Sequence, residues 1–440
     1  MTTVLAINKM IGDVVWGPPM LILLLGTGIL LSCLTGFIVI RKFVYIMRNT
    51  LMKMFKKSGH GEGEVSVFQA VSTALAATVG TGNIAGVALA IAIGGPGAVF
   101  WMWLSAIFGM TTKFSEAILA ITYRKKNQDG SFSGGPMYYI ARGLGYRWLA
   151  GLFATFAMIA SFGIGCMTQS NSIADALKSS FNVNPIIVGV VLAVLSGIVI
   201  LGGIQRIGQV TEKLVPFMAL FYIVGALAII LINIKDIPNA FSMIFSTAFT
   251  GQAATGGFAG STMMMALRNG VSRGVFEVFM DTIVICTMTA LVVLVSGVWD
   301  SGLQGAALTS AAFDEGFRGG KYIVSIGLTL FAFSTILGWS YYGEKCAEYI
   351  LGKKFITPYR LVYICLVFVG AIGGLQSIWA ISDTLNGLMA IPNLIGLVLL
   401  SGVVVIMVKD FFKDPDRIRE NEKEYLSVLP EKYQPRNVDK

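Results

Sequence analysis

Long apolar runs recur along nearly the whole 440-residue chain. A helix needs about 20 apolar residues to cross a bilayer, and only helices and closed barrels can bond their own backbone groups inside lipid. The sequence therefore predicts an all-α polytopic membrane protein. We expect eleven transmembrane helices, at residues 16–40, 66–94, 97–122, 149–176, 185–203, 214–233, 240–266, 278–298, 322–343, 359–373 and 377–408.

The composition excludes several other classes. Hydrophobic residues make up 55% of the chain and charged residues only 13%, against about 25% charged in soluble proteins. The net charge of +9 does not indicate nucleic-acid binding, because the basic residues stand in short segments between apolar runs. The expected partner is the lipid bilayer. One histidine, His60, and five cysteines without paired spacing give no pattern for a metal centre.

Lysine and arginine concentrate on one side of the predicted membrane. The segments after the first, third and ninth helices are rich in them, and so is the chain from Lys409 onward. Because cytoplasmic segments carry the excess of basic residues, we expect a plasma-membrane protein with its N-terminus outside and its C-terminus in the cytoplasm. The first 15 residues show no cleavable signal pattern, so the first helix should be retained.

The second apolar run contains a glycine-rich interruption, Val79-Gly80-Thr81-Gly82-Asn83. Each interior glycine costs a helix about 1 kcal/mol relative to alanine, so the helix should loosen or break there. At membrane depth, free backbone groups are tolerated only where protein or a polar cavity receives them, which favours a binding site. From this stretch alone, close helix packing by the two glycines is the alternative.

A second interruption, from Thr255 to Thr262, lies in a helix that begins near Pro238 and runs in the opposite direction. The sequence thus predicts two inverted five-helix halves, each opening with a broken helix, which is the best sequence indication of a transporter's substrate site. The expected division is an N-terminal helix and basic loop at 1–60, the two halves at 61–236 and 237–410, and a cytoplasmic tail at 411–440, in which a helix end leads into a mobile terminus.

The stretch GTGNIAGVALAIAIGGPGAVFWMW, with SGGPMYY, STILGW and NGLMAIPN further on, resembles the alanine or glycine:cation symporter family, the sodium:alanine symporters. The resemblance implies the leucine-transporter fold with one added N-terminal helix. It also implies import of alanine or glycine with sodium as the coupling ion and no organic cofactor. One departure is that Phe276 runs directly into Glu277, where the family usually has a further segment. We expect a missing segment there, visible as a Cα–Cα distance well above ~3.8 Å.

The predicted break offers groups for both charged ends of an amino acid. N–H groups at the start of its outer piece suit a carboxylate, and free carbonyls suit an ammonium group. Gln169 is favoured as a carboxylate or amide partner, because the resemblance places a glutamine there, whereas Asn171 is a second candidate or a helix contact. Bonding back to its own helix is the alternative for Thr78 and for Thr262. The expected substrate contacts are Thr78, Gly80, Thr81, Gly82, Asn83, Gln169, Asn171, Phe258, Ala259, Ser261, Thr262 and Met263.

The resemblance also implies a sodium site between the first broken helix and the ninth helix. Its ligands are the carbonyl oxygens of Ala76, Val79 and Phe331 and the hydroxyls of Ser334 and Thr335. Five neutral oxygens on two helices can replace the water around a hard cation.

Charged residues inside apolar runs are functional candidates, because burying them in lipid is costly. Lys113 and Glu116 are three residues apart, so a mutual ion pair is the first interpretation. Asp281, near the inner end of the eighth helix, is a candidate for a proton or a second cation, or for pairing with a loop arginine. Trp379 and Asp383 are candidates for a gate on the last helix.

These features predict a sodium-coupled importer of small neutral amino acids, with L-alanine or glycine as substrate, that works by alternating access. A proton-coupled transporter of the same fold, with Asp281 or Glu116 carrying the proton, is the alternative. An enzyme is not expected, because HExxH, GxSG and GxGD motifs are absent. A channel would need a continuous polar lining, which no run shows.

Overall fold

The computed structural model describes residues 2–55, 65–127, 132–257, 274–373, 376–414 and 426–436. The first half contains α1 (Thr2–Val15), α2 (Pro18–Leu34), α3 (Ile38–Arg41), α4 (Phe43–Phe55), α5 (Val67–Thr78), η1 (Thr81–Asn83), α6 (Ala85–Gly94), α7 (Ala98–Thr122), β1 (Lys125–Lys126), β2 (Phe132–Ser133), α8 (Pro136–Tyr139), η2 (Ile140–Leu144), α9 (Arg147–Ala160), η3 (Ser161–Met167), α10 (Thr168–Phe181), α11 (Pro185–Ile200) and α12 (Gly203–Ile232).

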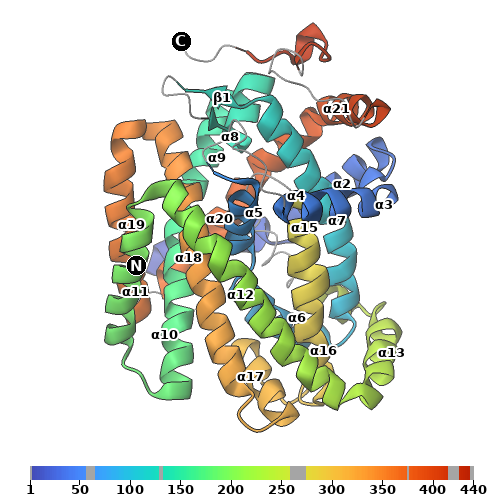
Figure 1. Cartoon of the computed structure of the whole chain (residues 1–440), viewed down its shortest axis with the longest axis vertical. Helices are drawn as coiled ribbons and strands as arrows, with labels where there is room; N and C mark the ends of the chain where they lie inside the picture. Colours follow the sequence, from blue (N-terminus) through green and yellow to red (C-terminus); the bar gives the residue numbers. More distant parts are fainter. Residues whose placement is uncertain are drawn as a thin grey trace.

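The second half contains η4 (Ile234–Asp236), α13 (Ile237–Thr247), α15 (Gly274–Val278), η5 (Phe279–Cys286), α16 (Thr287–Val295), α17 (Gly305–Gly316), α18 (Lys321–Leu351), η6 (Lys353–Phe355), α19 (Ile356–Ile372), α20 (Gln376–Leu399), α21 (Ser401–Lys413) and η7 (Glu431–Tyr433). Figure 1 shows β1, α8 and α21 near the C-terminus at one end of the bundle, with α13 and α17 at the other end. The all-α class is confirmed.

Eight helical segments are long and apolar enough to cross a membrane, so the chain is a multi-pass membrane protein. They correspond to eight of the eleven expected helices. Of the other three, the second is divided between α5 and α6, and the fifth is the 16-residue α11. The seventh begins as α13 and leads beyond the described residues. The count of eleven therefore stays a prediction.

The second predicted helix is broken at the predicted place. Ser66 and Gln69 form a capping box at the start of α5, and α5 then ends at Thr78. Val79 and Gly80 have extended backbone, with φ/ψ of −79°/101° and −139°/−155°, before the short turn η1 leads into α6. The chain therefore leaves the helix for two residues in the middle of an apolar segment, and the backbone groups on both sides need other partners.

Helix α18 is the central support of this break. It is 31 residues long, and it packs against α5, α9, α10 and α12. Two other helical segments contain π-helical turns, η3 between α9 and α10, which packs on α18, and η5 between α15 and α16. Such turns free or shift backbone groups inside a helix and often mark functional positions.

Two parts of the chain, one near the N-terminus and one in the tail, differ from what the sequence predicted. The basic loop expected after residue 40 is helical, because α4 alternates apolar residues with Arg48 and Lys53 and can lie along an apolar surface. The tail is not wholly mobile, since residues 426–436 pack on the body. Tyr123 Oη donates to the Tyr433 carbonyl at 2.9 Å, and the Arg436 N–H donates to the Arg142 carbonyl at 2.8 Å.

The second half differs as well. Helix α17, between the eighth and ninth expected spans, was not anticipated. A turn at 248–250 follows α13, residues 251–257 are helical, and the rest of the second predicted interruption, 258–262, lies outside the described residues. Helix α15 runs through Phe276 and Glu277 without interruption, and the missing segment expected between them stays a prediction.

Candidate functional site

The five oxygens expected to hold sodium lie together where α5 ends. Ser334 Oγ is 3.3 Å from the Ala76 carbonyl oxygen, and Thr335 Oγ1 is 3.3 Å from the Val79 carbonyl oxygen. Both hydroxyls also donate to the Phe331 carbonyl, at 2.8 and 2.9 Å. Two helices thus direct three carbonyls and two hydroxyls at one buried point. No charged group belongs to this set.

Small residues let α18 approach α5 this closely. A Cβ on Gly338 would lie 2.6 Å from Ala77 Cβ, so any side chain at this position would separate the helices. One residue further on, Trp339 Nε1 donates to the Ala77 carbonyl at 3.2 Å. This bond has no signal in the sequence, because a tryptophan on an apolar helix normally indicates packing alone. Helix α18 therefore contacts the carbonyls of Ala76, Ala77 and Val79, which α5 leaves without helical partners at its broken end.

Gln169 extends the same site toward a ligand. It is 1% exposed and stands just after the π-helical turn η3, whose Ile164 carbonyl accepts from Gln169 Nε2 at 3.1 Å. Its Oε1 has no hydrogen-bond partner among the described residues and lies 3.6 Å from where a Cβ on Gly80 would stand. A buried amide oxygen without a donor costs about 1–3 kcal/mol, so this group suits a ligand's N–H.

Asn83 holds the break in shape. Its Oδ1 accepts from the Gly80 N–H at 2.9 Å, and its Nδ2 donates to Asp281 Oδ1 at 2.7 Å and to the Asp281 carbonyl at 3.1 Å. Its own carbonyl accepts from Thr289 Oγ1 at 2.9 Å. The amide of one residue therefore joins the broken helix to η5 and α16, with Asp281 fixing the orientation of that amide.

These contacts correct the expectation that all four N–H groups at the break face the substrate. The Gly80 N–H is bonded to Asn83 Oδ1, and the Asn83 N–H is bonded to the Gly80 carbonyl at 3.2 Å. Among the described residues, no backbone acceptor pairs with the N–H groups of Thr81 and Gly82, which remain candidate anion donors. The Thr78 hydroxyl donates to the Ala74 carbonyl of its own helix at 2.9 Å, which is the alternative to a substrate contact given above. It also contacts Glu277.

Asp281, expected near the inner end of the eighth helix, lies against Asn83 at the break. It is 1% exposed, and its second carboxylate oxygen accepts from Thr282 Oγ1 at 2.9 Å. A buried carboxylate held by hydrogen-bond donors at a helix break is a candidate functional group in a membrane.

The remaining candidates have different surroundings. Asn171 lies against Gly373 at the end of α19, which fits a helix contact better than a ligand contact. Lys113 Nζ is 3.6 Å from Glu116 Oε2, which confirms the predicted ion pair. The Asp383 carbonyl accepts from Trp16 Nε1 at 3.3 Å, so this part of α20 contacts the N-terminal helices. The expected contacts Phe258, Ala259, Ser261, Thr262 and Met263 lie outside the described residues, and so does the side chain of Trp379.

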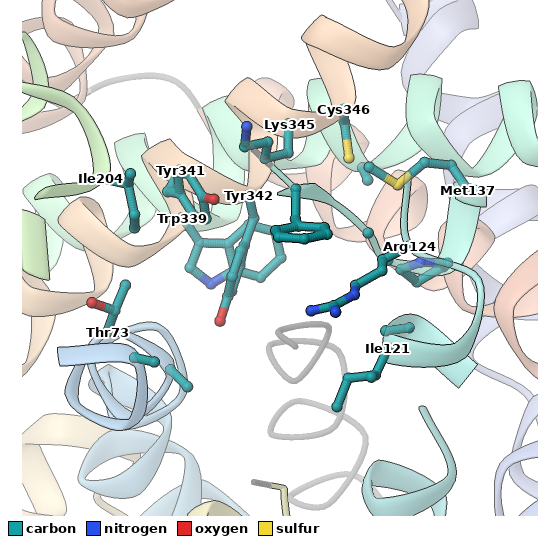
Figure 2. Close-up of a pocket in the computed structure, with 18 of the residues that line it drawn as sticks. Thr73, Ile121, Arg124, Met137, Ile204, Trp339, Tyr341, Tyr342, Lys345 and Cys346 are labelled. Atoms are coloured by element: carbon teal, nitrogen blue, oxygen red, sulfur yellow. The ribbon is translucent and has the colours of Figure 1, made fainter. Parts of the chain in front are cut away.

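A cavity of about 300 Å³ lies on one side of the break, between α5, α7, α9 and α18. Figure 2 shows Thr73 of α5 facing Trp339 and Tyr342 of α18 across it, with Arg124 at its far side. Trp339 both lines this cavity and follows the Ser334–Thr335 pair by one helical turn. The cavity therefore comes within about one helical turn of the oxygen cluster, and its lining also includes Phe132 of β2 and Met137 of α8.

A broken helix whose carbonyls meet hydroxyls of a second helix, with a cavity nearby, is typical of a secondary transporter. The chain belongs to the sodium:alanine symporter family, whose sequence profile matches residues 1–277 and 274–425. It is an amino-acid:cation symporter and not an enzyme. The two matched segments meet at 274–277, where we expected this chain to lack part of the family sequence, and that shortening stays a prediction.

Individual relatives agree with this family. The chain is 48% identical to the sodium/alanine symporter AgcS of Methanococcus maripaludis, over 94% of this chain and 97% of that protein. It is 36% identical to the putative sodium/proton-dependent alanine carrier protein YrbD of Bacillus subtilis, over 90% of each. A mutant form of the Eremococcus coleocola manganese transporter matches with a TM-score of 0.46 and 13% identity, over 85% of this chain and 92% of that chain.

Proposed function

We propose that this protein is a sodium-coupled importer of small neutral amino acids, with alanine or glycine as its substrate. The observation that supports this most directly is the meeting of five neutral oxygens at the break, from Ala76, Val79, Phe331, Ser334 and Thr335. A monovalent hard cation needs oxygen ligands in place of its water but no strong counter-charge, and this set supplies both conditions.

The amino acid would bind next to the ion. Its ammonium group would donate to Gln169 Oε1, the buried acceptor without a partner, and its carboxylate would accept from the N–H groups of Thr81 and Gly82. Gly80 connects the two sites, since it lies beside both Thr335 Oγ1 and Gln169 Oε1. Ion and substrate then stabilise the same arrangement of the break, and their affinities must rise together.

The direction of transport follows from the charge distribution and the cavity. We place the N-terminus outside and the C-terminus in the cytoplasm of the plasma membrane, because the basic segments gather with β1, α8 and α21. The cavity beside Trp339 lies on that same side of the break, so it would serve as the release route. Binding would begin from the outside, and closure there would precede release.

Replacing Gln169 with leucine should weaken substrate binding specifically. The buried amide is lost, so the substrate ammonium would lose its acceptor, and the KM for alanine should rise about tenfold or more. Ser172→Ala is the matched control, since Ser172 lies on the same helix and bonds only back to the Thr168 carbonyl. Uptake of labelled alanine across a concentration series measures this. An equal KM in both variants would remove Gln169 from the substrate site.

Proton coupling is a second candidate, and the position of Asp281 favours it. A buried carboxylate that orients Asn83 at the break would change the shape of the break when it gains a proton. The test is alanine uptake into proteoliposomes under a sodium gradient alone and under a pH gradient alone. We expect accumulation with sodium only, and Asp281→Asn should keep sodium-driven uptake within about tenfold, because asparagine also accepts a hydrogen bond from Asn83. Accumulation under the pH gradient alone, lost in Asp281→Asn, would establish the second candidate instead.

A further inference from the structure

Four polar side chains form a network across three helices, separate from the five oxygens of the ion site. The Tyr139 hydroxyl of α8 donates to Asn393 Oδ1 of α20, and Asn393 Nδ2 donates to Glu116 Oε1 of α7 at 2.5 Å. Lys113 Nζ, also of α7, lies 3.6 Å from Glu116 Oε2. Tyr139, Asn393 and Lys113 are at most 4% exposed. The network therefore joins α7, α8 and α20 in the interior of the protein.

Packing alone does not explain this network. Removing two charges from water costs more than their attraction returns, unless good geometry and further hydrogen bonds complete the site. Lys113 Nζ has no hydrogen-bond partner among the described residues, so its pairing with Glu116 is incomplete. An ion pair of this kind inside a membrane helix is a candidate for a role in transport.

The three helices of the network also form part of the cavity beside the break. Ala120 of α7, Met137 of α8 and Met389 of α20 line this cavity of about 300 Å³. Each of them stands within four residues of a network residue on its own helix. A shift of one helix against the other two would therefore change the width of the cavity.

Helix α20 can bend where the network holds it. Pro392 lies inside this helix and has no N–H, so the carbonyl four residues earlier loses its helical partner. Asn393 is the next residue. Beyond it α20 packs closely on α8, since a Cβ on Gly396 would lie 3.2 Å from Tyr139 Cε2. The hydrogen bonds of Asn393 therefore set the angle between the two parts of α20, and Met389 of the cavity wall belongs to the first part.

We propose that Asn393 is a positioning residue for release, whose bonds to Glu116 and Tyr139 keep the cavity narrow and must break before the amino acid leaves. It acts through the helices that it joins and not through contact with the ligand. In the described arrangement Cys346 lines the cavity and is only 5% exposed. Loss of the network should let α20 bend at Pro392, widen the cavity and expose Cys346. The role in release rests on the proposed function, whereas the control of cavity width does not.

The rate at which N-ethylmaleimide labels Cys346 measures the opening of the cavity. The parent protein is the full chain with Cys33→Ser and Cys365→Ser, because these two cysteines are exposed. Intact-mass spectrometry counts the labels, and Cys346→Ser should remove the signal. Cys166 and Cys286 are buried, so labels beyond the first identify unfolded protein and not an open cavity.

Tyr139→Phe and Asn393→Ala should each raise the labelling rate of the parent about tenfold or more, because each removes a buried hydrogen bond of the network. Tyr139→Phe keeps the ring and loses only the hydroxyl, so it tests the network even if Asn393→Ala fails to fold. Thr384→Ala is the matched control. Thr384 is a buried residue of α20 whose hydroxyl donates to the Ala380 carbonyl of its own helix, and its removal should leave the rate unchanged.

A second pair of variants separates the hydrogen bond from charge and volume. Lys113→Met combined with Glu116→Gln removes both charges and keeps an acceptor for Asn393, so labelling should stay near the parent's rate. Lys113→Met combined with Glu116→Leu has the same charge and a similar volume but no acceptor, and labelling should be about tenfold faster. Equal rates in these two variants, or parental rates in both Tyr139→Phe and Asn393→Ala, would overturn the proposal.

Uptake of labelled alanine by proteoliposomes under a sodium gradient tests the role in release. Because the network must form again in every cycle, the maximal rate should fall severalfold in Asn393→Ala, and it should be higher in the glutamine variant than in the leucine variant. If labelling responds as expected but the parent does not take up alanine, the proposed function fails while the control of the cavity by Asn393 stands. If the parent transports alanine and labelling does not respond, the positioning role fails alone.

Discussion

Replacing Ser334 and Thr335 together with alanine is expected to raise the sodium concentration for half-maximal uptake by about a hundredfold. The two hydroxyls supply two of the five oxygens that meet at the end of α5, and both stand within 3.3 Å of a carbonyl on that helix. A hydrogen-bonding group that faces a charge contributes about 1.5 kcal/mol or more, so losing two costs about 3 kcal/mol. Uptake measured over a sodium series gives the shift directly.

Ser340→Ala is the matched control for this double substitution. Ser340 is a buried hydroxyl on the same helix, but its Oγ donates only to the Leu337 carbonyl of its own helix, at 2.7 Å. Its removal should leave the sodium dependence unchanged. The KM for alanine at saturating sodium should also stay nearly constant in the double variant, because its missing groups face the ion. An unchanged sodium dependence in the double variant would show that sodium does not bind at these two hydroxyls.

The sequence predicted the fold well because lipid limits what a chain can do. Apolar runs of the right length, basic segments between them and a glycine-rich interruption each have one main structural meaning in a membrane. The break at Val79 and Gly80 was predicted from two glycines and is present. Helix α4 was missed because its mixture of apolar and basic residues also suits a loop. Docking of residues 426–436 was missed because its partners, Tyr123 and Arg142, are some 300 residues away in the chain.

It was harder to predict which of the backbone groups freed at the break remain available to a ligand. The break itself indicates that N–H and C=O groups lose their helical partners, but neighbouring helices decide which of them stay available. Asn83 returns to the Gly80 N–H, and Asp281, nearly 200 residues later, holds that asparagine in place. Neither contact has a local sequence signal. The partners of the freed carbonyl groups could be predicted, because the resemblance implied Ser334 and Thr335 as sodium ligands. Two adjacent hydroxyls on one helix can also reach two carbonyls together.

The orientation of the Gln169 side chain is a second detail that the sequence indicated only in part. The resemblance placed a glutamine near the substrate without stating which end of the amide would face it. The π-helical turn η3 exposes the Ile164 carbonyl, which takes the amide nitrogen and turns the oxygen toward the break. A π-turn depends on how two helices fit together and not on a residue pattern, so this detail required the structure.

Gly80→Ala is expected to lower uptake by about ten- to a hundredfold, although the backbone at this position accepts any residue. Gly80 has extended φ and ψ angles, so the substitution introduces no backbone strain. The effect comes from space, because a Cβ there would lie 2.7 Å from Thr335 Oγ1. Contact that close must displace the hydroxyl, and this hydroxyl is one of the proposed sodium ligands. Gly26→Ala, at a position with open space around it, is the control and should transport normally.

A double variant separates crowding from a general loss of helix flexibility. If the added methyl group acts by pushing Thr335, Gly80→Ala should lower the free energy of unfolding by about 1–3 kcal/mol, and Thr335→Ala in the same chain should restore most of it. Uptake should stay low in that double variant, because the hydroxyl is then missing altogether. Additive losses of stability in the two single variants would mean that Gly80 and Thr335 do not touch, and the α5–α18 contact on which the ion site depends would be wrong.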